Sequence, residues 1–183
     1  MTDLSLIIVS YNTRRLTCAC LASVLAAGAD MAEVFVVDNA SADDSAAAIR
    51  ERFPAVRLIV NARNRGFAAA NNQVLPLCRG RYLFFLNPDT EVAPDALTRA
   101  VAFMDAHPRI GLAGARICNP DGSPQESVSL RYPGAKHTRD ELAGLPGPIA
   151  CVLGAAMIAR TELIRQIGGF DEAFFLYGED QDL

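Results

Sequence analysis

The sequence contains little histidine, and its cysteines do not fall into a metal-binding arrangement. Only two of the 183 residues are histidines, His107 and His137, and neither has a neighbour that suggests catalysis. The five cysteines are scattered and odd in number, and Cys18 and Cys20 are not followed by a second Cys or His pair. These absences argue against a zinc site and favour free thiols in a reducing compartment.

The chain also has no excess of basic residues and no long apolar run. Its formal net charge of -4 argues against a protein that binds a nucleic-acid polymer by bulk electrostatics. The longest apolar run, residues 149–159, is too short to cross a bilayer, and the N-terminus has no basic region of a secretory signal. We therefore expect a cytoplasmic protein, with peripheral contact at the inner face of the plasma membrane left open.

Two common nucleotide-binding motifs are missing as well. Neither G-x-G-x-x-G nor G-x-x-x-x-G-K-[ST] occurs, which excludes the dinucleotide-binding and P-loop classes on their first requirement. The binding of one nucleotide stays open, because local hydrogen-bonding groups decide it.

Strand-like and helix-like segments alternate through most of the chain. Five apolar runs predict strands, at 4–9, 33–37, 56–60, 82–86 and 110–115, of which 4–9 is typical of a central strand and 33–37 and 82–86 of buried strands. Four intervening segments predict helices, at about 13–27, 43–53, 67–78 and 94–106. This alternation predicts an α/β fold with a mainly parallel sheet. Beyond residue 117 we expect an excursion at 123–148, a strand-like run at 151–159 and a short helix capped by Thr161.

The stretch of residues 81–91 is where we expect the chemistry. Residues 82–86 have the composition of a strand buried on both faces, and Pro88 ends that strand. Asp89 then lies just beyond the carboxyl end, where open α/β sheets bind their ligands. A carboxylate there suits a hard cation such as Mg²⁺. The alternative is that this stretch only turns the chain into the next helix.

Polar residues follow the other predicted strands in the same way. They are Ser10-Tyr11-Asn12, Asp38-Asn39 and Asn64-Arg65-Gly66. In a parallel sheet these segments are neighbouring loops on one edge, so together they predict one pocket. An Asp there accepts a hydrogen bond from a base or ribose, and backbone at a helix N-terminus approaches phosphate. Asp38 has an alternative role as the cap of the next helix.

Seven short motifs occur in a family-specific order. They are Val9-Ser-Tyr-Asn12, Val37-Asp-Asn-Ala-Ser41, Asn64-Arg-Gly-Phe-Ala-Ala-Ala-Asn-Asn72, Leu86-Asn-Pro-Asp-Thr90, Gly154-Ala-Ala-Met157, Gly168-Gly-Phe-Asp-Glu172 and Gly178-Glu-Asp-Gln-Asp-Leu183. This order resembles a family 2 inverting glycosyltransferase of the rhamnosyltransferase-like branch. The resemblance implies a GT-A fold, which is a Rossmann-like α/β/α sandwich. It also implies one domain over 1–183, with a nucleotide-sugar-binding half at 1–118 and an acceptor-side half at 119–183. We expect the second half to be incomplete, because the sequence stops at the acidic motif.

The resemblance also implies roles for individual residues. Asp38 would bind the uracil or thymine ring, and Asp89 would hold Mg²⁺ or Mn²⁺ against the diphosphate. Asn87 replaces the first acid of the D-x-D-type motif, so metal binding would be weak or would depend on bound donor. The implied donor-binding residues are Ser10, Tyr11, Asn12, Asp38, Asn64, Arg65, Gly66, Phe67 and Asn87. The implied acceptor-side residues are Gly154, Ala155, Gly169, Phe170 and Asp171.

Asp180, beside Glu179, would be the general base. A carboxylate in reach of the acceptor hydroxyl suits that role, and a second nucleophilic carboxylate is not required. The alternative is that both acids only form the acidic first turn of a helix.

The resemblance thus predicts metal-assisted transfer of a sugar from dTDP-rhamnose or a UDP-sugar to a hydroxyl of a cell-surface glycan or lipid-linked saccharide. A nucleotide-sugar-binding module without turnover is one alternative. A nucleotidyltransferase is a weaker one, because it needs a glycine- and lysine-bearing loop where residues 10–15 read Ser-Tyr-Asn-Thr-Arg-Arg.

Overall fold

Apolar runs form the centre of the molecule, a six-stranded sheet with the order β3-β2-β1-β4-β10-β5. The computed structural model describes residues 2–28, 32–125, 127–129 and 151–183. Four strands run parallel: β1 (Leu4–Ser10), β2 (Ala32–Asp38), β3 (Arg57–Val60) and β4 (Tyr82–Leu86). β10 (Ala156–Arg160) runs antiparallel between β4 and β5 (Leu112–Gly114). The predicted α/β fold with a mainly parallel sheet is confirmed.

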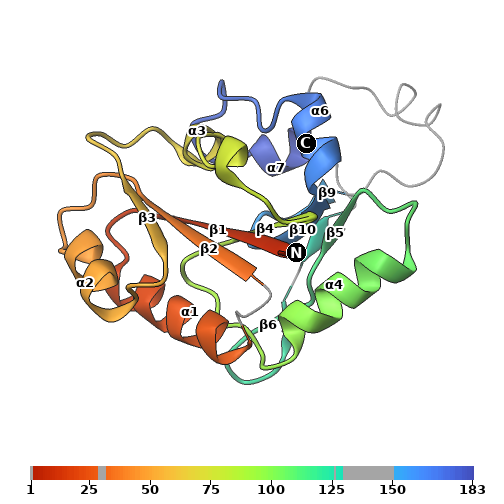
Figure 1. Cartoon of the computed structure of the whole chain (residues 1–183), viewed down its shortest axis with the longest axis horizontal. Coiled ribbons are helices and arrows are strands. Elements are labelled where there is room, and N and C mark those ends of the chain that lie inside the picture. Colours follow the sequence, from red (N-terminus) through yellow and green to blue (C-terminus); the bar gives the residue numbers. More distant parts are fainter. Residues whose placement is uncertain (1, 29–31, 126, 130–150) are drawn as a thin grey trace.

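Helices cover both faces of this sheet (Figure 1). On one face lie α1 (Arg14–Ala26), α2 (Ser45–Arg52) and α4 (Ala96–Ala106). On the other lie α3 (Phe67–Asn72), the 3-10 helix η2 (Leu75–Leu77), α6 (Thr161–Ile167) and α7 (Glu179–Asp182). Two short hairpins pair β6 (Ile117–Cys118) with β7 (Pro124–Gln125) and β8 (Val128–Ser129) with β9 (Cys151–Val152).

Alternation along the central strands supplies a core on each side. Leu6 and Ile8 of β1 pack into the cluster that includes α1 and α4. Ile7 and Val9 pack into the opposite cluster, which includes residues of α3 and α6. Successive strand residues point to opposite faces, so a fully apolar strand is one that is covered on both.

Three local expectations were wrong. The helix expected over 67–78 ends at Asn72, because the ring of Pro76 would clash with the carbonyl four residues earlier, which is that of Asn72. The run 151–159 is divided between β9 and β10. Thr161 does not cap α6, because it is the first helical residue and its hydroxyl donates to the carbonyl of Gly80 at 2.7 Å. Most of the excursion expected at 123–148 lies outside the described residues.

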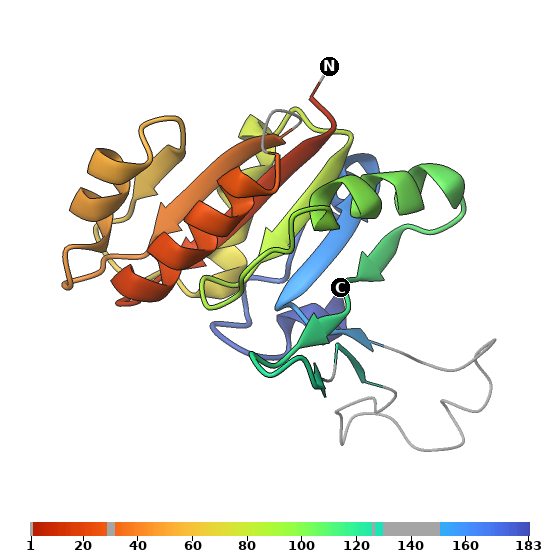
Figure 2. The ribbon, with the colours of Figure 1, turned by 90° about the horizontal axis from the view of Figure 1, so that it is seen from below.

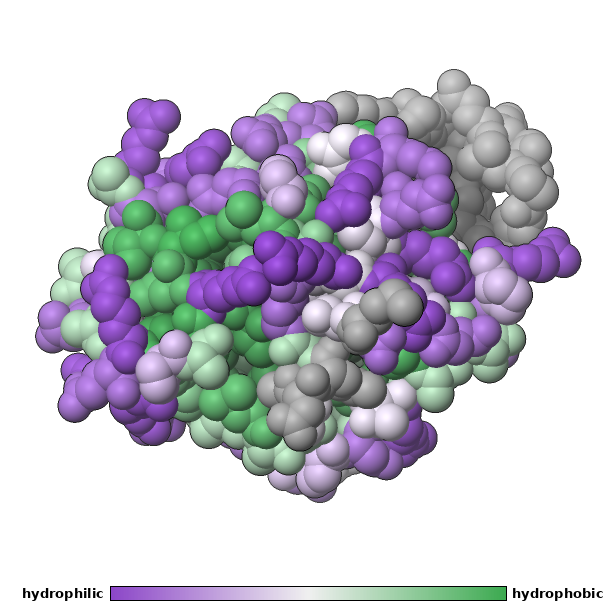
Figure 3. Space-filling view, viewed as in Figure 1, coloured by the Kyte–Doolittle hydropathy of each residue, from purple (hydrophilic) through white to green (hydrophobic). Residues whose placement is uncertain are grey.

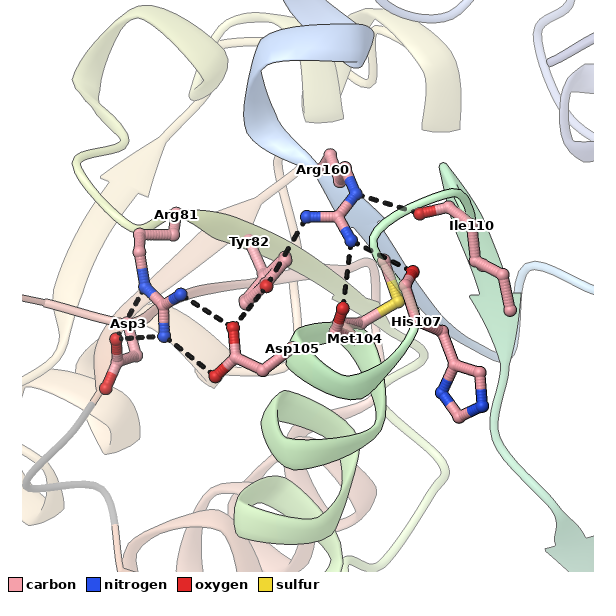
Figure 4. A network of polar contacts seen from close by, with 8 residues as sticks. All are labelled: Asp3, Arg81, Tyr82, Met104, Asp105, His107, Ile110 and Arg160. Atoms are coloured by element: carbon pink, nitrogen blue, oxygen red, sulfur yellow. Dashed lines mark hydrogen bonds and ion pairs between the residues drawn. The ribbon is translucent and has the colours of Figure 1, made fainter.

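Arginine side chains close the amino edge of the sheet (Figure 4). Arg160 donates to the carbonyls of Met104 and His107, at 2.9 and 3.1 Å, and so binds the C-terminal end of α4. Asp105 accepts hydrogen bonds from Arg81 and the hydroxyl of Tyr82, which lower the pKa of its carboxyl to about 2. This network lies at the opposite end of β4 from Asp89 and the predicted site.

Apolar side chains gather on the left of the face in Figure 3, towards the edge strand β3. Val60 and Leu77 are exposed. Arg57 lies over the ring of Phe35 and pairs with Glu33 at 3.1 Å, so it covers part of that apolar surface. Among the described helices, none is long and apolar enough to cross a membrane.

Candidate active site

Asp38 lies at the carboxyl end of β2, opposite Ser10 at the end of β1. Its side chain is buried, and Oδ2 accepts a hydrogen bond from the backbone N–H of Ser41 at 3.2 Å. Ser41 lies in the turn before α2, so Asp38 does not cap that helix. Oδ1 is buried and has no hydrogen-bond partner within the described part of the chain. A buried carboxylate oxygen without a partner is costly, which makes Oδ1 a candidate acceptor for a ligand donor.

The loop after β1 is tied to the loop after β2. The N–H of Asn12 donates to the hydroxyl of Ser41 at 2.9 Å, and its Oδ1 accepts from the N–H of Ala42 at 2.8 Å. Tyr11, between these contacts and the strand, is 49% exposed and can pack on a ligand ring. The hydroxyl of Ser10 is buried and bonded to Thr17 at 2.9 Å, so it is engaged by α1.

The loop after β3 reaches the same edge. Oδ1 of Asn64 accepts from the N–H of Gly66 at 2.9 Å and from the amide of Asn39 at 2.7 Å. The guanidinium of Arg65 donates to Gln73 at 2.8 Å, so its charge lies beside α3. Three consecutive loops therefore meet at the carboxyl edge, as the sequence predicts.

The segment 169–175 packs against both ends of α3. The N–H of Phe67 donates to the carbonyl of Phe175 at 2.8 Å, and a Cβ on Gly66 would lie only 2.5 Å from that oxygen. At the other end of α3, the amide of Asn72 both accepts from the N–H and donates to the carbonyl of Phe170, at 2.9 and 2.8 Å. The loop after β3, which is predicted to bind the donor, is thus in direct contact with the predicted acceptor side.

Within that segment, the predicted residues are placed differently from one another. Phe170 is buried edge-on against Phe85, with ring centroids 4.9 Å apart, so its ring belongs to the core. Gly169 leaves no room for a side chain, because a Cβ would lie 2.4 Å from Oδ1 of Asn72. Asp171 is exposed and accepts from the N–H of Ala173 at 2.9 Å, which closes a turn.

The turn after β4 presents Asp89. Its first residue, Asn87, donates its N–H to the carbonyl of Ala155 at 2.9 Å and accepts from the hydroxyl of Thr90 at 2.7 Å. Cys20 of α1 lies beneath this turn, and burial raises the pKa of its thiol to about 12, so it is unreactive. Asp89 is exposed and makes no hydrogen bond or ion pair with the residues that the structure describes.

The side-chain oxygens of this turn fit a divalent cation that also binds a ligand. No cluster of three His, Cys, Asp or Glu side chains occurs in the described ranges. A free carboxylate at Asp89, beside the amide of Asn87, matches the sparse protein ligation of Mg²⁺, which takes its other oxygens from substrate phosphates and water.

The helix α7, which begins with the acidic pair Glu179 and Asp180, lies near the carboxyl end of β4 (Figure 2). Oδ2 of Asp180 accepts from the N–H of Gly154 at 2.8 Å, and the next residue, Ala155, binds Asn87. Glu179 is buried, its Oε2 has no hydrogen-bond partner among the described residues, and burial raises the pKa of its carboxyl. The nearby charge of Asp180 adds to that rise.

Two residues of this arrangement, Asn72 and Phe175, were not assigned to the site from the sequence, and Asn39 was grouped with the predicted pocket without a role of its own. Asn39 and Asn72 stand inside two of the quoted motifs, which was the available signal, although Asn72 also fits a helix surface. Phe175 contributes a backbone carbonyl, and no residue pattern indicates that contact.

A sheet of this order, with loops, a free carboxylate and an acidic helix at its carboxyl edge, defines a GT-A glycosyltransferase fold. Residues 5–168 match the model of Glycosyl transferase family 2, and the chain belongs to that family. Its rhamnosyltransferase-like branch is supported by a relative at 28% identity over 214 residues, N-acetylglucosaminyl-diphospho-decaprenol L-rhamnosyltransferase of Mycobacterium tuberculosis. That match covers 100% of this chain and 70% of the relative. The expected family and fold are confirmed.

Further similarities support the same family. Succinoglycan biosynthesis protein ExoO of Rhizobium meliloti is 35% identical over 147 residues, which cover 79% of this chain and 39% of that protein. Among solved structures, a mannosyltransferase of Pyrobaculum calidifontis in complex with GDP-Man and Mn²⁺ superposes with a TM-score of 0.69 at 25% identity. It is matched over 93% of this chain and 48% of its own, so the chain spans about half its length. S. aureus TarS in complex with UDP gives 0.68 at 24% identity, covering 98% of this chain and 53% of its own, and shows the fold alone.

Proposed function

We propose that this chain transfers a sugar from a nucleoside-diphosphate sugar to an acceptor hydroxyl, with inversion at the anomeric carbon. Glycosyl transfer is the activity of the family, and the residues at the carboxyl edge supply the groups that this reaction needs. The donor class, the inverting course and the use of a metal are the parts that are proposed.

The single observation that carries the donor proposal is the free Oδ1 of Asp38. It is buried at the end of β2 and lacks a partner among the described residues. Uracil and thymine each present one ring N–H, which would satisfy this oxygen. Tyr11 would then offer a ring to the base, and Asn64–Phe67 would close the donor side. dTDP-rhamnose is the first donor to test, because the relative from M. tuberculosis is an L-rhamnosyltransferase.

Asp89 would hold Mg²⁺ or Mn²⁺ together with the donor diphosphate, beside Asn87. When bound, the cation supplies positive charge that stabilises the departing diphosphate. The neighbour from P. calidifontis was solved with Mn²⁺ and GDP-Man, which supports a cation in this family.

Asp180 would be the general base. The N–H of Gly154 holds its Oδ2 at 2.8 Å, and its other oxygen is left for the acceptor. Asp180 takes the proton of the acceptor hydroxyl while that oxygen attacks the anomeric carbon and the bond to the diphosphate oxygen breaks. A positioned base contributes about 10²–10⁴-fold to such a step. Gly154, Ala155 and residues 169–171 would border the acceptor side, and the acceptor would be a glycan or a lipid-linked saccharide.

The proposal is tested by calorimetry and thermal shift with UDP, dTDP, UDP-sugars and dTDP-rhamnose, each with and without Mn²⁺. We expect one pyrimidine nucleotide to bind and to raise the melting temperature, and Asp38→Asn to weaken its binding about tenfold or more, because a hydrogen bond to a charged group is lost. Asp105→Asn, at the amino edge, is the matched control and is expected to leave binding unchanged. Failure of every nucleotide to bind would contradict the proposed function.

A nucleotide-sugar-binding module without turnover is the second candidate. The chain covers 48% of the P. calidifontis enzyme, so sugar transfer by this chain needs a test separate from nucleotide binding. Nucleotide binding without sugar transfer, with every candidate acceptor, would support it.

A further inference from the structure

Asn39 is a buried amide at the point where three loops meet. It follows Asp38 at the end of β2, and its side chain is 2% exposed. Its Nδ2 donates to Oδ1 of Asn64 at 2.7 Å and to the carbonyl of Gly66 at 3.1 Å. Both acceptors belong to the loop that follows β3.

The oxygen of the same amide also accepts two hydrogen bonds. Oδ1 of Asn39 accepts from Nδ2 of Asn61 and from the backbone N–H of Arg65, each at 3.0 Å. Its backbone N–H donates to the carbonyl of Ser10 at 2.7 Å. An Asn amide has two donor hydrogens and two acceptor positions, so every hydrogen-bonding position of this side chain is occupied.

These contacts connect the ends of three neighbouring strands. Ser10 ends β1, Asn39 follows β2, and residues 61–66 lie between β3 and α3. Residues 61–66 form no strand or helix, so side-chain contacts such as these fix their conformation. A fully satisfied buried amide holds a unique geometry, because any displacement leaves buried donors or acceptors without partners.

We infer that Asn39 is a positioning residue for the donor: it does not touch the nucleotide, but holds loop 61–66 against the edge that carries Asp38. The inference rests on the proposed function. Donor affinity therefore depends on a residue whose own amide has no free hydrogen-bonding position to offer a ligand.

The chemistry of position 39 is restrictive. An aspartate there would have almost the same shape and would keep the two acceptor positions used by Asn61 and Arg65. It would lose both donors and place a carboxylate oxygen against Oδ1 of Asn64 and the carbonyl of Gly66. Asn39→Asp therefore disturbs the loop without creating a cavity.

The test compares three variants of the full chain, with UDP and dTDP in the presence of Mn²⁺ as probes. Asn39→Asp is expected to weaken nucleotide binding about tenfold or more, and Asn61→Ala, which removes one of the four contacts, a few-fold. Thr161→Val is the matched control: it removes a buried side-chain hydrogen bond to Gly80 at the opposite edge of the sheet. We expect it to lower the melting temperature and to leave nucleotide affinity unchanged.

Two readouts separate positioning from a general loss of stability. Hydrogen exchange without nucleotide should speed up in residues 61–67 of Asn39→Asp, while the β1 and β4 strands stay protected. With a donor that is turned over, KM for the donor should rise while kcat at saturating donor stays within about twofold.

The outcomes are distinguishable. Wild-type affinity with unchanged exchange in 61–67 of Asn39→Asp would overturn the inference alone, as would faster exchange without a loss of affinity. If Asn39→Asp fails to fold, Asn61→Ala decides in the same way. A wild-type chain that binds neither nucleotide would overturn the proposed function and this inference together.

Discussion

The carboxylate of Asp180 accepts a hydrogen bond from the backbone N–H of Gly154 at 2.8 Å. The next residue along, Ala155, accepts from the N–H of Asn87 at 2.9 Å, at the start of the turn that presents Asp89. Asp180 and the turn that carries Asp89 are therefore bound by adjacent residues of one loop, although the two acids are 91 positions apart in the sequence. This arrangement is what a reaction needs when one acid serves the leaving group and the other serves the attacking hydroxyl.

Asp89→Ala tests the role of the free carboxylate. We expect Mn²⁺ to strengthen nucleotide binding to the wild-type chain and to strengthen it much less in this variant, because one ligand of the cation is lost. Calorimetry with Mn²⁺ and with EDTA measures the difference. Glu91→Ala is the control on the same turn, and an equal loss there would show that general negative charge, not the position of Asp89, is responsible.

Gly66→Ala tests the contact between the donor loop and Phe175. An added Cβ would lie 2.5 Å from the carbonyl oxygen of Phe175, and Gly66 has a φ of +83°. Gly122→Ala is a close control, with a φ of +82° and nothing within 4 Å of the added Cβ. A positive φ strains an added side chain at both positions, and Gly66, with a ψ of 173°, lies in a region that essentially only glycine adopts. Urea unfolding should show a larger loss for Gly66→Ala, and equal losses would contradict close packing at this contact.

Glu179→Gln tests the buried acid on α7. Burial raises the pKa of this carboxyl above 4.5, so the folded chain holds the proton more tightly than the unfolded chain does. The associated stability is present below pH 4.5 and is lost as the pH rises through the folded-state pKa. At pH 7 the variant should therefore melt higher, by ~2–4 °C for a gain of ~1 kcal/mol, and at pH 4 the gain should disappear.

The control for that experiment is Glu51→Gln at an exposed position of α2, where a surface substitution changes stability by no more than about 0.5 kcal/mol. A melting temperature of Glu179→Gln that is lowered at pH 7 would show that the charged carboxylate is satisfied in the folded chain. A melting temperature raised equally at both pH values would show that the gain does not come from removing the charge.

Arg160→Met tests the network at the amino edge (Figure 4). It leaves the carbonyls of Met104, His107 and Ile110 without their guanidinium donor. Urea unfolding at pH 7 should show a loss of about 1.5–3 kcal/mol, while nucleotide affinity stays unchanged. Arg99→Met removes only an exposed i,i+4 pair with Asp95 and should cost no more than about 0.5 kcal/mol. Equal losses would mean that Arg160 does not hold α4.

The sheet was predictable because its strands are apolar on both faces. Residues 4–9 and 82–86 lack the alternation of a half-exposed strand, which indicates helices on both sides. The end of α3 was not predicted, although Pro76 indicates that the helix cannot continue through it. The division of 151–159 into two strands depends on pairing with residues distant in sequence, which a local apolar run does not reveal.

The candidate site was predictable at its strand ends and less so at its supports. Asp38 and Asp89 stand out because each follows an apolar strand. The four side-chain hydrogen bonds of Asn39 depend on how three loops approach one another, which the short motif that contains Asn39 does not reveal. Phe175 acts through its carbonyl oxygen, a group that every residue has, so side-chain patterns could not identify it.

Asp180→Asn gives the most direct test of the central claim. The variant keeps an oxygen for the N–H of Gly154 but loses the basicity needed to take a proton. With dTDP-rhamnose or the UDP-sugar that binds, and a glycan or lipid-linked saccharide acceptor that the wild-type chain glycosylates, release of nucleoside diphosphate should fall by about 10²-fold or more, while nucleotide Kd stays within about twofold. Turnover at the wild-type rate would contradict the account.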